Sequence, residues 1–149
     1  MTVARVIPAP PDAVFAAFLD PDKLLAWLPP GGMTGTIQHF DARAGGGYRM
    51  TLAYPAGETR FKGKTTAKED VVDVRFVVLD LPRRIVEAVR FAGGDPAFAG
   101  EMTIAIDFRA AAGGTEVAFT SSNLPPGLKA QDNDEGTRLS LENLARLFA

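Results

Sequence analysis

The chain has 149 residues and a formal net charge of −2, with 46% hydrophobic and 23% charged residues, which suits one globular domain with a single core. Its Lys and Arg residues are scattered, so the sequence offers no basic face for nucleic acid. It has no cysteine, which excludes disulfides, thiolate metal sites and a cysteine nucleophile.

The chain opens with a strand-like run over residues 2–7. Because Met1 leads straight into this run, nothing at the start resembles a signal peptide. No apolar stretch approaches the ~20 residues that cross a bilayer, so we expect no membrane span. A cytoplasmic location is the resulting expectation.

Two short helices are predicted next. In the first, Pro10 and Pro11 suit the opening turn, and Val14, Phe15, Phe18 and Leu19 form one apolar face. A second helix starts at Pro21, carries Leu24, Leu25, Trp27 and Leu28, and is capped by Asp20. The run Pro29-Pro30-Gly31-Gly32 then forces a turn.

The long middle of the chain is predicted to be an antiparallel sheet. Strand candidates cover residues 34–41 and 48–54, separated by Gly45-Gly46-Gly47, which suits a tight hairpin. Large apolar side chains then alternate with polar ones in three further sets, a pattern typical of a sheet covered on one face. These sets are Val72, Val74, Phe76 and Val78; Met102, Ile104, Ile106 and Phe108; and Val117 with Phe119.

The segments between the strands are read as turns and loops. Residues 80–83 and 111–114 are predicted turns, and residues 55–69 are a polar loop with room for a short strand. A longer connection over residues 92–100 contains Phe98 and is placed over one mouth of the sheet.

The chain ends in an amphipathic helix predicted over residues 132–149, with Leu141, Leu144 and Phe148 on one stripe. Asp132 and Glu135 have the spacing of a capping box. Gly136 inside this helix costs roughly 1 kcal/mol relative to alanine. Close packing against the sheet is favoured as its reason over space left for a ligand.

The order of these motifs resembles the SRPBCC superfamily, also called START-like or birch-pollen-allergen-like. The opening match is Phe15 to Phe18 followed by Pro21, Leu24 and Trp27-Leu28-Pro29. The run from Phe40 to Met50, with its three glycines, resembles the branch named after the activator of the heat-shock protein 90 ATPase. Gly114-Thr115-Glu116-Val117 and Glu135-Gly136 agree with it, and the resemblance covers essentially the whole chain.

The resemblance implies an α+β helix-grip fold in which a curved antiparallel sheet of about seven strands (β-α-α-β6-α) wraps around a long C-terminal helix. The chain departs from the family's pattern at Thr137, where the resemblance implies an aromatic residue. This difference would alter the contact of the helix or the shape of the pocket. A chaperone partner is implied by the family name alone.

A helix that spans a twisted sheet need not fill all the space beneath it. Ten side chains are therefore predicted to line a cavity for a small hydrophobic or aromatic ligand: Trp27, Tyr48, Met50, Tyr54, Phe76, Met102, Ile104, Phe119, Leu141 and Leu144. The alternative is that these side chains meet and fill the core, but as a set in this fold they favour a partly open cavity.

Polar candidates for chemistry are few. His39 is the only histidine, and alternation turns it outward if Phe40 faces inward. Glu87 is in phase with the apolar side chains of its strand, where a buried carboxylate would need Arg75 or Arg49 as a partner. An outward salt bridge at a sheet edge is favoured for Glu87.

No metal or cofactor is expected, because one histidine, no cysteine and dispersed carboxylates give no ligand spacing. The serines lack the context of a nucleophile elbow. We also expect Asp73 to pair with Arg75, which shares its strand face.

Three functional classes stay open. A non-catalytic carrier or sensor of a small apolar or aromatic molecule is favoured. An enzyme acting on a hydrophobic substrate in the same cavity and a protein interaction module are the alternatives. The sequence does not identify the ligand, any reaction or the pocket volume, and it leaves a homodimer open.

Overall fold

The structure, a computed structural model, describes residues 2–54 and 69–149. Its elements are β1 (Thr2–Ile7), α1 (Pro11–Ala16), α2 (Pro21–Trp27), β2 (Thr34–Asp41), β3 (Gly47–Ala53), β4 (Glu69–Asp80), β5 (Arg84–Phe91), the 3-10 helix η1 (Pro96–Phe98), β6 (Met102–Ala111), β7 (Gly114–Ser122) and α3 (Ala130–Leu147).

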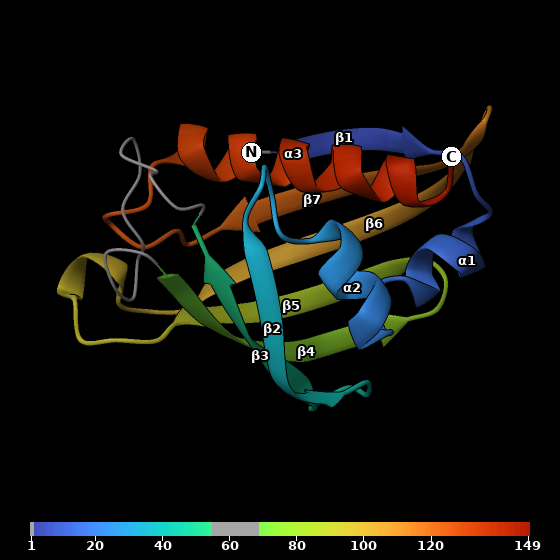
Figure 1. Cartoon of the computed structure of the whole chain (residues 1–149). Helices are drawn as coiled ribbons and strands as arrows, with labels where there is room; N and C mark the ends of the chain where they lie inside the picture. The colour runs from blue at the N-terminus through green and yellow to red at the C-terminus, as the bar shows by residue number, and fades with distance from the viewer. Residues whose placement is uncertain (1, 55–68) are drawn as a thin grey trace.

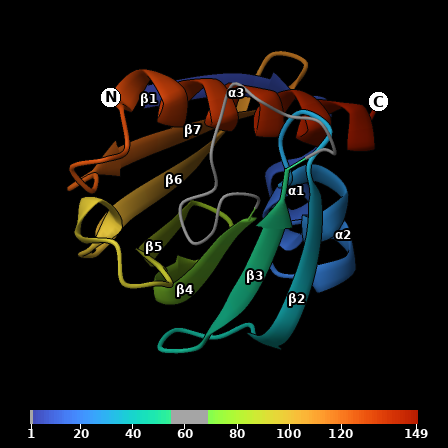
Figure 2. The ribbon, with the colours of Figure 1, turned by 60° about the vertical axis from the view of Figure 1, so that its left-hand side comes forward.

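The seven strands in this part of the chain form one antiparallel sheet with the order β1-β7-β6-β5-β4-β3-β2. The sheet curves, α3 lies across its concave side, and α1 and α2 lie together near one end of it (Figures 1 and 2). This arrangement confirms the predicted α+β helix-grip fold. No helix among the described residues is long and apolar enough to cross a membrane.

The short helices begin as their sequences predict. Pro11 occupies the first turn of α1, and the Asp20 carboxylate caps α2 by accepting from the backbone N–H groups of Asp22 at 3.0 Å and Lys23 at 3.4 Å. The first helix is shorter than its apolar pattern suggested. It ends at Ala16, yet Phe18 beyond it is still buried.

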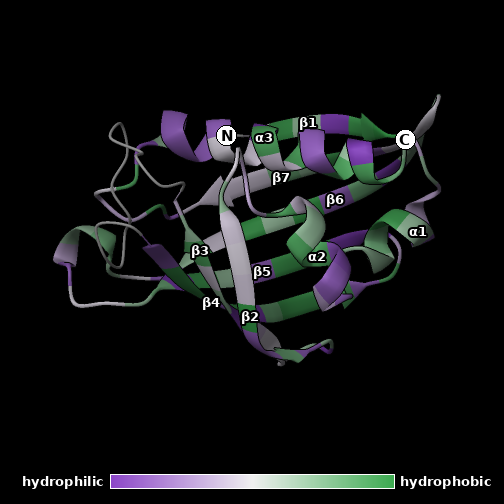
Figure 3. Ribbon diagram, in the orientation of Figure 1, coloured by the Kyte–Doolittle hydropathy of each residue, from purple (hydrophilic) through white to green (hydrophobic). Residues whose placement is uncertain are grey.

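Alternation sets the two faces of the sheet. Val74, Phe76, Ile106 and Phe108 are buried on the concave side. Figure 3 shows green hydrophobic bands along the strands, interrupted by hydrophilic ones. A Cβ at Gly47, where β3 begins, would collide with the backbone of Val74 on β4. A glycine is therefore required here by close strand approach.

Aromatic side chains fill one half of the concave side. Phe18 packs on Trp27 with ring centroids 4.6 Å apart and on Phe108 at 5.2 Å, and Phe15 packs on Phe108 at 5.0 Å. The Trp27 Nε1–H donates to the Ala17 carbonyl at 3.0 Å, which satisfies the one polar atom of this side chain. These aromatic side chains pack closely in the half of the interior that lies under α1 and α2.

The last helix starts two residues earlier than predicted. It begins at Ala130 with Lys129 as N-cap and no side-chain cap, so the expected capping box of Asp132 and Glu135 is wrong. Asp132 is already the third helical residue. Glu135 instead pairs with Arg138 one turn later.

Across the outer face, ion pairs follow cross-strand register. The predicted Asp73–Arg75 pair is wrong, because Asp73 accepts two bonds from Arg49, at 2.7 and 2.8 Å, and Arg75 approaches Glu101 at 3.5 Å. Arg49 stands directly opposite Asp73 on β3, closer than a residue two positions along the same strand.

Two of the predicted connections join the strands β3 to β4 and β5 to β6. The loop predicted over residues 55–69 lies outside the described residues except for Glu69, the first residue of β4. The connection over residues 92–100 contains η1, and Phe98 at its end lies edge-on to Phe91 with centroids 6.2 Å apart. This connection therefore packs against the end of β5.

Candidate functional site

A cavity of about 330 Å³ lies between the concave face of the sheet and the first half of α3. Large apolar side chains from β3 to β7 form much of its wall, and the α2–β2 connection contributes Leu28, Pro30, Gly31 and Met33. Helix α3 covers it with small and polar residues: Asp132, Asn133, Glu135, Gly136, Thr137 and Ser140, together with Leu139.

Six of the ten predicted lining residues lie on this cavity. They are Tyr48, Met50, Tyr54, Met102, Ile104 and Phe119. The other four, Trp27, Phe76, Leu141 and Leu144, are at most 1% exposed and belong to the filled part of the core. The division follows the two halves of α3, whose C-terminal half buries its leucines while its N-terminal half leaves space.

Gly136 is one reason for that space. A Cβ built on this glycine would meet nothing within 4 Å, and the residue lies on the cavity wall. The prediction that close packing against the sheet explains Gly136 is therefore wrong. Thr137, the position at which the resemblance implied an aromatic residue, also lines the cavity.

Polar contacts hold α3 in place at both ends of the cavity. Towards its C-terminus, the Ser140 hydroxyl donates to the Leu28 carbonyl at 2.6 Å, and Asn143 Nδ2 donates to the carbonyls of Trp27 and Pro29 at 3.2 and 3.1 Å. Near its N-terminus, Asn133 Nδ2 donates to the Ser121 hydroxyl at 3.1 Å. Hydrogen bonds to β7 and to the end of α2 thus hold the helix in place, in addition to apolar packing.

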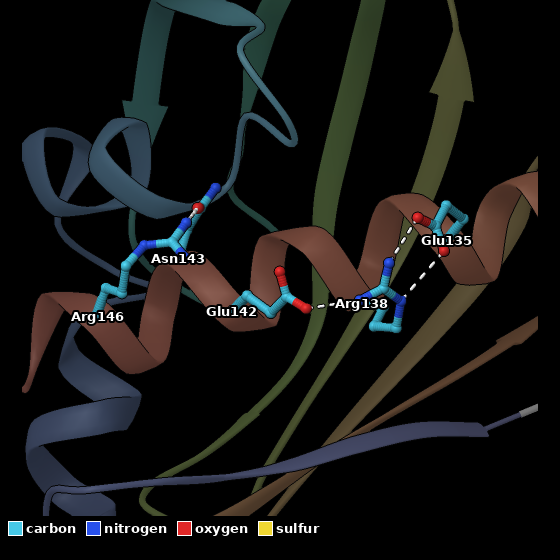
Figure 4. A network of polar contacts seen from close by, with 5 residues as sticks. All are labelled: Glu135, Arg138, Glu142, Asn143 and Arg146. Atoms are coloured by element: carbon cyan, nitrogen blue, oxygen red, sulfur yellow. Dashed lines mark hydrogen bonds and ion pairs between the residues drawn. The ribbon is translucent and has the colours of Figure 1, made fainter.

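An ion-pair network lies on the exposed side of α3 (Figure 4). Arg138 bonds the Glu135 carboxylate at 2.6 and 3.1 Å and Glu142 at 2.5 Å. Arg146 bonds Asn143 in the same view. These pairs turn the charges of the helix towards solvent and hold Glu135 at the rim of the cavity.

Glu87 is the unexpected feature of the interior. Its side chain is 7% exposed and lies on the cavity wall, so the predicted outward salt bridge at a sheet edge is wrong. Residue 87 belongs to β5, the fourth of seven strands across the sheet, and its cross-strand neighbours are Phe76 and Ile104. The alternation with Ile85 and Val89 had already indicated the inward direction.

No partner stabilises the charged form of Glu87 within residues 2–54 and 69–149: the structure gives its carboxylate neither a hydrogen bond nor an ion pair there. Burial accordingly raises the pKa of Glu87 from 4.5 to about 7. Glu87 therefore changes charge near neutral pH.

A second buried carboxylate lies further along the same wall. Asp70 on β4 is 4% exposed and accepts a hydrogen bond from the Tyr54 hydroxyl at 3.2 Å. The sequence reading missed Asp70, although it is in phase with Val72, Val74 and Phe76 and so had the same signal as Glu87.

His39 lies away from the cavity. It is exposed, as the inward direction of Phe40 predicts, and it stands opposite Arg49 on the outer face. Its charge contributes to lowering the pKa of Asp73, after the larger effect of the hydrogen bond from Arg49. His39 is therefore not placed to act on a molecule in the cavity.

Comparison with known proteins places this geometry in a family. The sequence matches the family model described as Activator of Hsp90 ATPase homolog 1-like protein over residues 8–149. The chain belongs to this family. The match confirms the resemblance to that branch of the SRPBCC superfamily. A comparison with curated proteins finds no match.

Several solved structures share the fold of this chain. A Chromobacterium violaceum protein is 29% identical, with a TM-score of 0.86 over 99% of this chain and 95% of that one. A Rhodobacter sphaeroides protein is 21% identical, with a TM-score of 0.76 over 98% and 89%. An Arthrobacter aurescens protein is 16% identical, with a TM-score of 0.79 over 99% and 84%.

Proposed function

We propose that this protein binds a small, largely apolar molecule in the cavity beneath the first half of α3, as a carrier or sensor. The observation that carries the proposal is the open space at Gly136, on a helix that is otherwise firmly tied to the sheet and to α2. A glycine that packs against nothing, at a cost of roughly 1 kcal/mol to the helix, is explained by the volume it leaves.

The size and wall of the cavity suit such a ligand. A volume of about 330 Å³ is at the lower end of the range of small-molecule pockets, roughly 300 to 1,000 Å³. Burial of about 150 Å² of apolar ligand surface would contribute about 4 kcal/mol before the costs of association. The ligand expected here is therefore small, with one or two rings or an equivalent chain.

An enzyme in the same cavity is the second candidate, and one observation favours it. Glu87 is a buried carboxyl group with a pKa of about 7 on the cavity wall, the property expected of a general acid or base. Binding remains the first choice because the structure pairs Glu87 with no nucleophile or second proton carrier within hydrogen-bonding distance in the described part of the chain.

The third hypothesis, that the protein is a protein interaction module, has less support. Five large apolar side chains are exposed in the described regions: Val6, Val77, Val78, Leu81 and Leu147. They are spread over β1, the end of β4 with its turn, and the last turn of α3. A chaperone partner is thus suggested by the family description alone.

Thermal unfolding with a panel of lipids, polyketides and aromatic compounds tests the proposal. A ligand at 100 times its Kd stabilises the folded protein by about 2.7 kcal/mol and raises its Tm. We expect hits with the wild type that are lost in Thr137→Trp, whose ring occupies the cavity. Hits that raise the Tm of both proteins equally would place binding elsewhere and refute the proposal.

A further inference from the structure

Glu87 gives the cavity a chemical preference. Its carboxylate lies in the wall with Phe76 and Ile104 on the flanking strands, and the described part of the chain supplies it with neither a hydrogen-bond donor nor a cation. A buried carboxylate without a partner is costly, whereas one that receives a charged N–H donor is stabilised. A donor carried by the ligand would fill this gap.

Among residues 2–54 and 69–149, the charged groups that line the cavity all have the same sign. They are four carboxylates: Asp70 and Glu87, which are buried, and Asp132 and Glu135, which lie at the exposed rim. The described lining residues include no Lys, Arg or His. A cavity lined by one sign of charge attracts the opposite sign, so a cationic ligand is favoured over an anionic one.

The other carboxylates are less suited than Glu87 to hold that cation. Asp70 already accepts a hydrogen bond from Tyr54, and Glu135 is paired with Arg138 outside the cavity. Aromatic rings of Tyr48, Phe91 and Phe119 lie on the same wall and can contact either an apolar body or a cation.

We propose that the ligand of this cavity is a small amine: an aromatic or aliphatic body whose protonated primary or secondary amino group donates to the Glu87 carboxylate. This inference rests on the proposed binding function and specifies its ligand class. It assigns Glu87 to recognition, since a single unpaired carboxylate suffices to hold an ammonium group.

The titration of Glu87 gives this proposal a signature. Burial raises its pKa to about 7 in the empty cavity, and a bound cation lowers it again, so binding releases a proton below neutral pH. Among the described residues, the other ionisable groups facing the cavity are Tyr48 on β3, Tyr54 just after it, Asp70 on β4, and Asp132 and Glu135 on α3; the lining residues from β6 and β7 are uncharged. We expect amine affinity to rise about tenfold from pH 6 to pH 8.

Calorimetric titration with matched pairs tests the inference. The probes are 2-phenylethylamine against 2-phenylethanol and 1-naphthylmethylamine against 1-naphthylmethanol, at pH 6 and pH 8. The proteins are the wild type, Glu87→Gln, which keeps the shape of the side chain, and the control Asp134→Asn, which removes a carboxylate of α3 that does not line the cavity.

In the wild type at pH 8, the amine of a pair should bind at least about tenfold tighter than its alcohol, the affinity that one charge-assisted bond adds. Glu87→Gln should abolish this preference and its pH dependence, and Asp134→Asn should keep both. An alcohol that binds as well as its amine, or a preference that survives Glu87→Gln, overturns the inference and leaves the proposed function intact. If neither these probes nor the apolar panel bind, the proposed function falls with it.

Discussion

Glu87 and Tyr48 line the same cavity, and they lie close enough for the charge of the Glu87 carboxylate to raise the pKa of the Tyr48 hydroxyl. Burial raises the pKa of Tyr48 well above 10, and the negative charge of Glu87 raises it further. The phenol stays neutral at any physiological pH, while Glu87 changes its charge near pH 7. Only one of these two groups therefore responds to pH, and its effect can be isolated by mutation.

The first prediction concerns stability and pH. The pKa of Glu87 is raised on folding from 4.5 to about 7, so its contribution to stability is fully present below pH 4.5 and is lost as pH rises through 7. The full loss is about 3 kcal/mol. Glu87→Gln should therefore unfold at a higher denaturant concentration than the wild type at pH 8, with the gap closing towards pH 5. A gap that does not depend on pH would show that Glu87 is not buried as described.

The second prediction concerns the open space at Gly136. Because a Cβ at this position meets nothing within 4 Å, Gly136→Ala should add roughly 1 kcal/mol to the free energy of unfolding through helix propensity. The matched control is Gly31→Ala, at a glycine on the same cavity with a φ of +48° and Leu139 Cδ1 only 3.2 Å from its added carbon. That variant should lose stability. Denaturant titration of both separates the two cases.

The third prediction concerns occupancy of the cavity. Thr137→Trp places an indole in the space beneath α3, and we expect it to weaken the binding of any cavity ligand by roughly 100-fold, or about 2.8 kcal/mol. Leu147→Trp, on an exposed position of the same helix, is the control and should bind as the wild type does. Equal weakening in both variants, measured by calorimetry, would point to a general disturbance of α3.

The fourth prediction is that a change in the filled core lowers stability but leaves ligand affinity unchanged. Trp27→Phe removes the hydrogen bond to the Ala17 carbonyl and should cost roughly 1 to 3 kcal/mol of stability. Since Trp27 packs against Phe18 away from the cavity wall, ligand affinity should be unchanged once the folded protein is compared at equal occupancy. A large loss of affinity in a folded Trp27→Phe would place this residue at the site after all.

Much of the fold was readable from the sequence because its signals are local. The Asp20 cap, the proline at the start of α1 and the period-two strands each depend on residues close together in the chain, and each is found in the structure. The start of α3 was missed because Asp132 and Glu135 fit a capping box by spacing alone. The actual start at Ala130 has no side-chain signal.

The candidate site was harder to read because it depends on volume between distant segments. Periodicity separates inward from outward side chains, but Phe76 and Met50 share that inward pattern while only Met50 reaches the cavity. Phe76 instead packs against the rings of Phe40 and Tyr48, with centroids 6.0 and 5.8 Å away. For Glu87, the apolar alternation of its strand correctly indicated an inward side chain. The general rule that buried carboxylates are paired pointed the other way, and Glu87 does not follow it.

Native mass spectrometry of the wild type and Thr137→Trp, both purified from the protein's own host, tests whether the cavity holds a ligand. We expect a small molecule bound to the folded wild type and none bound to Thr137→Trp. A bare polypeptide mass for both proteins, or the same bound mass retained by both, would contradict it.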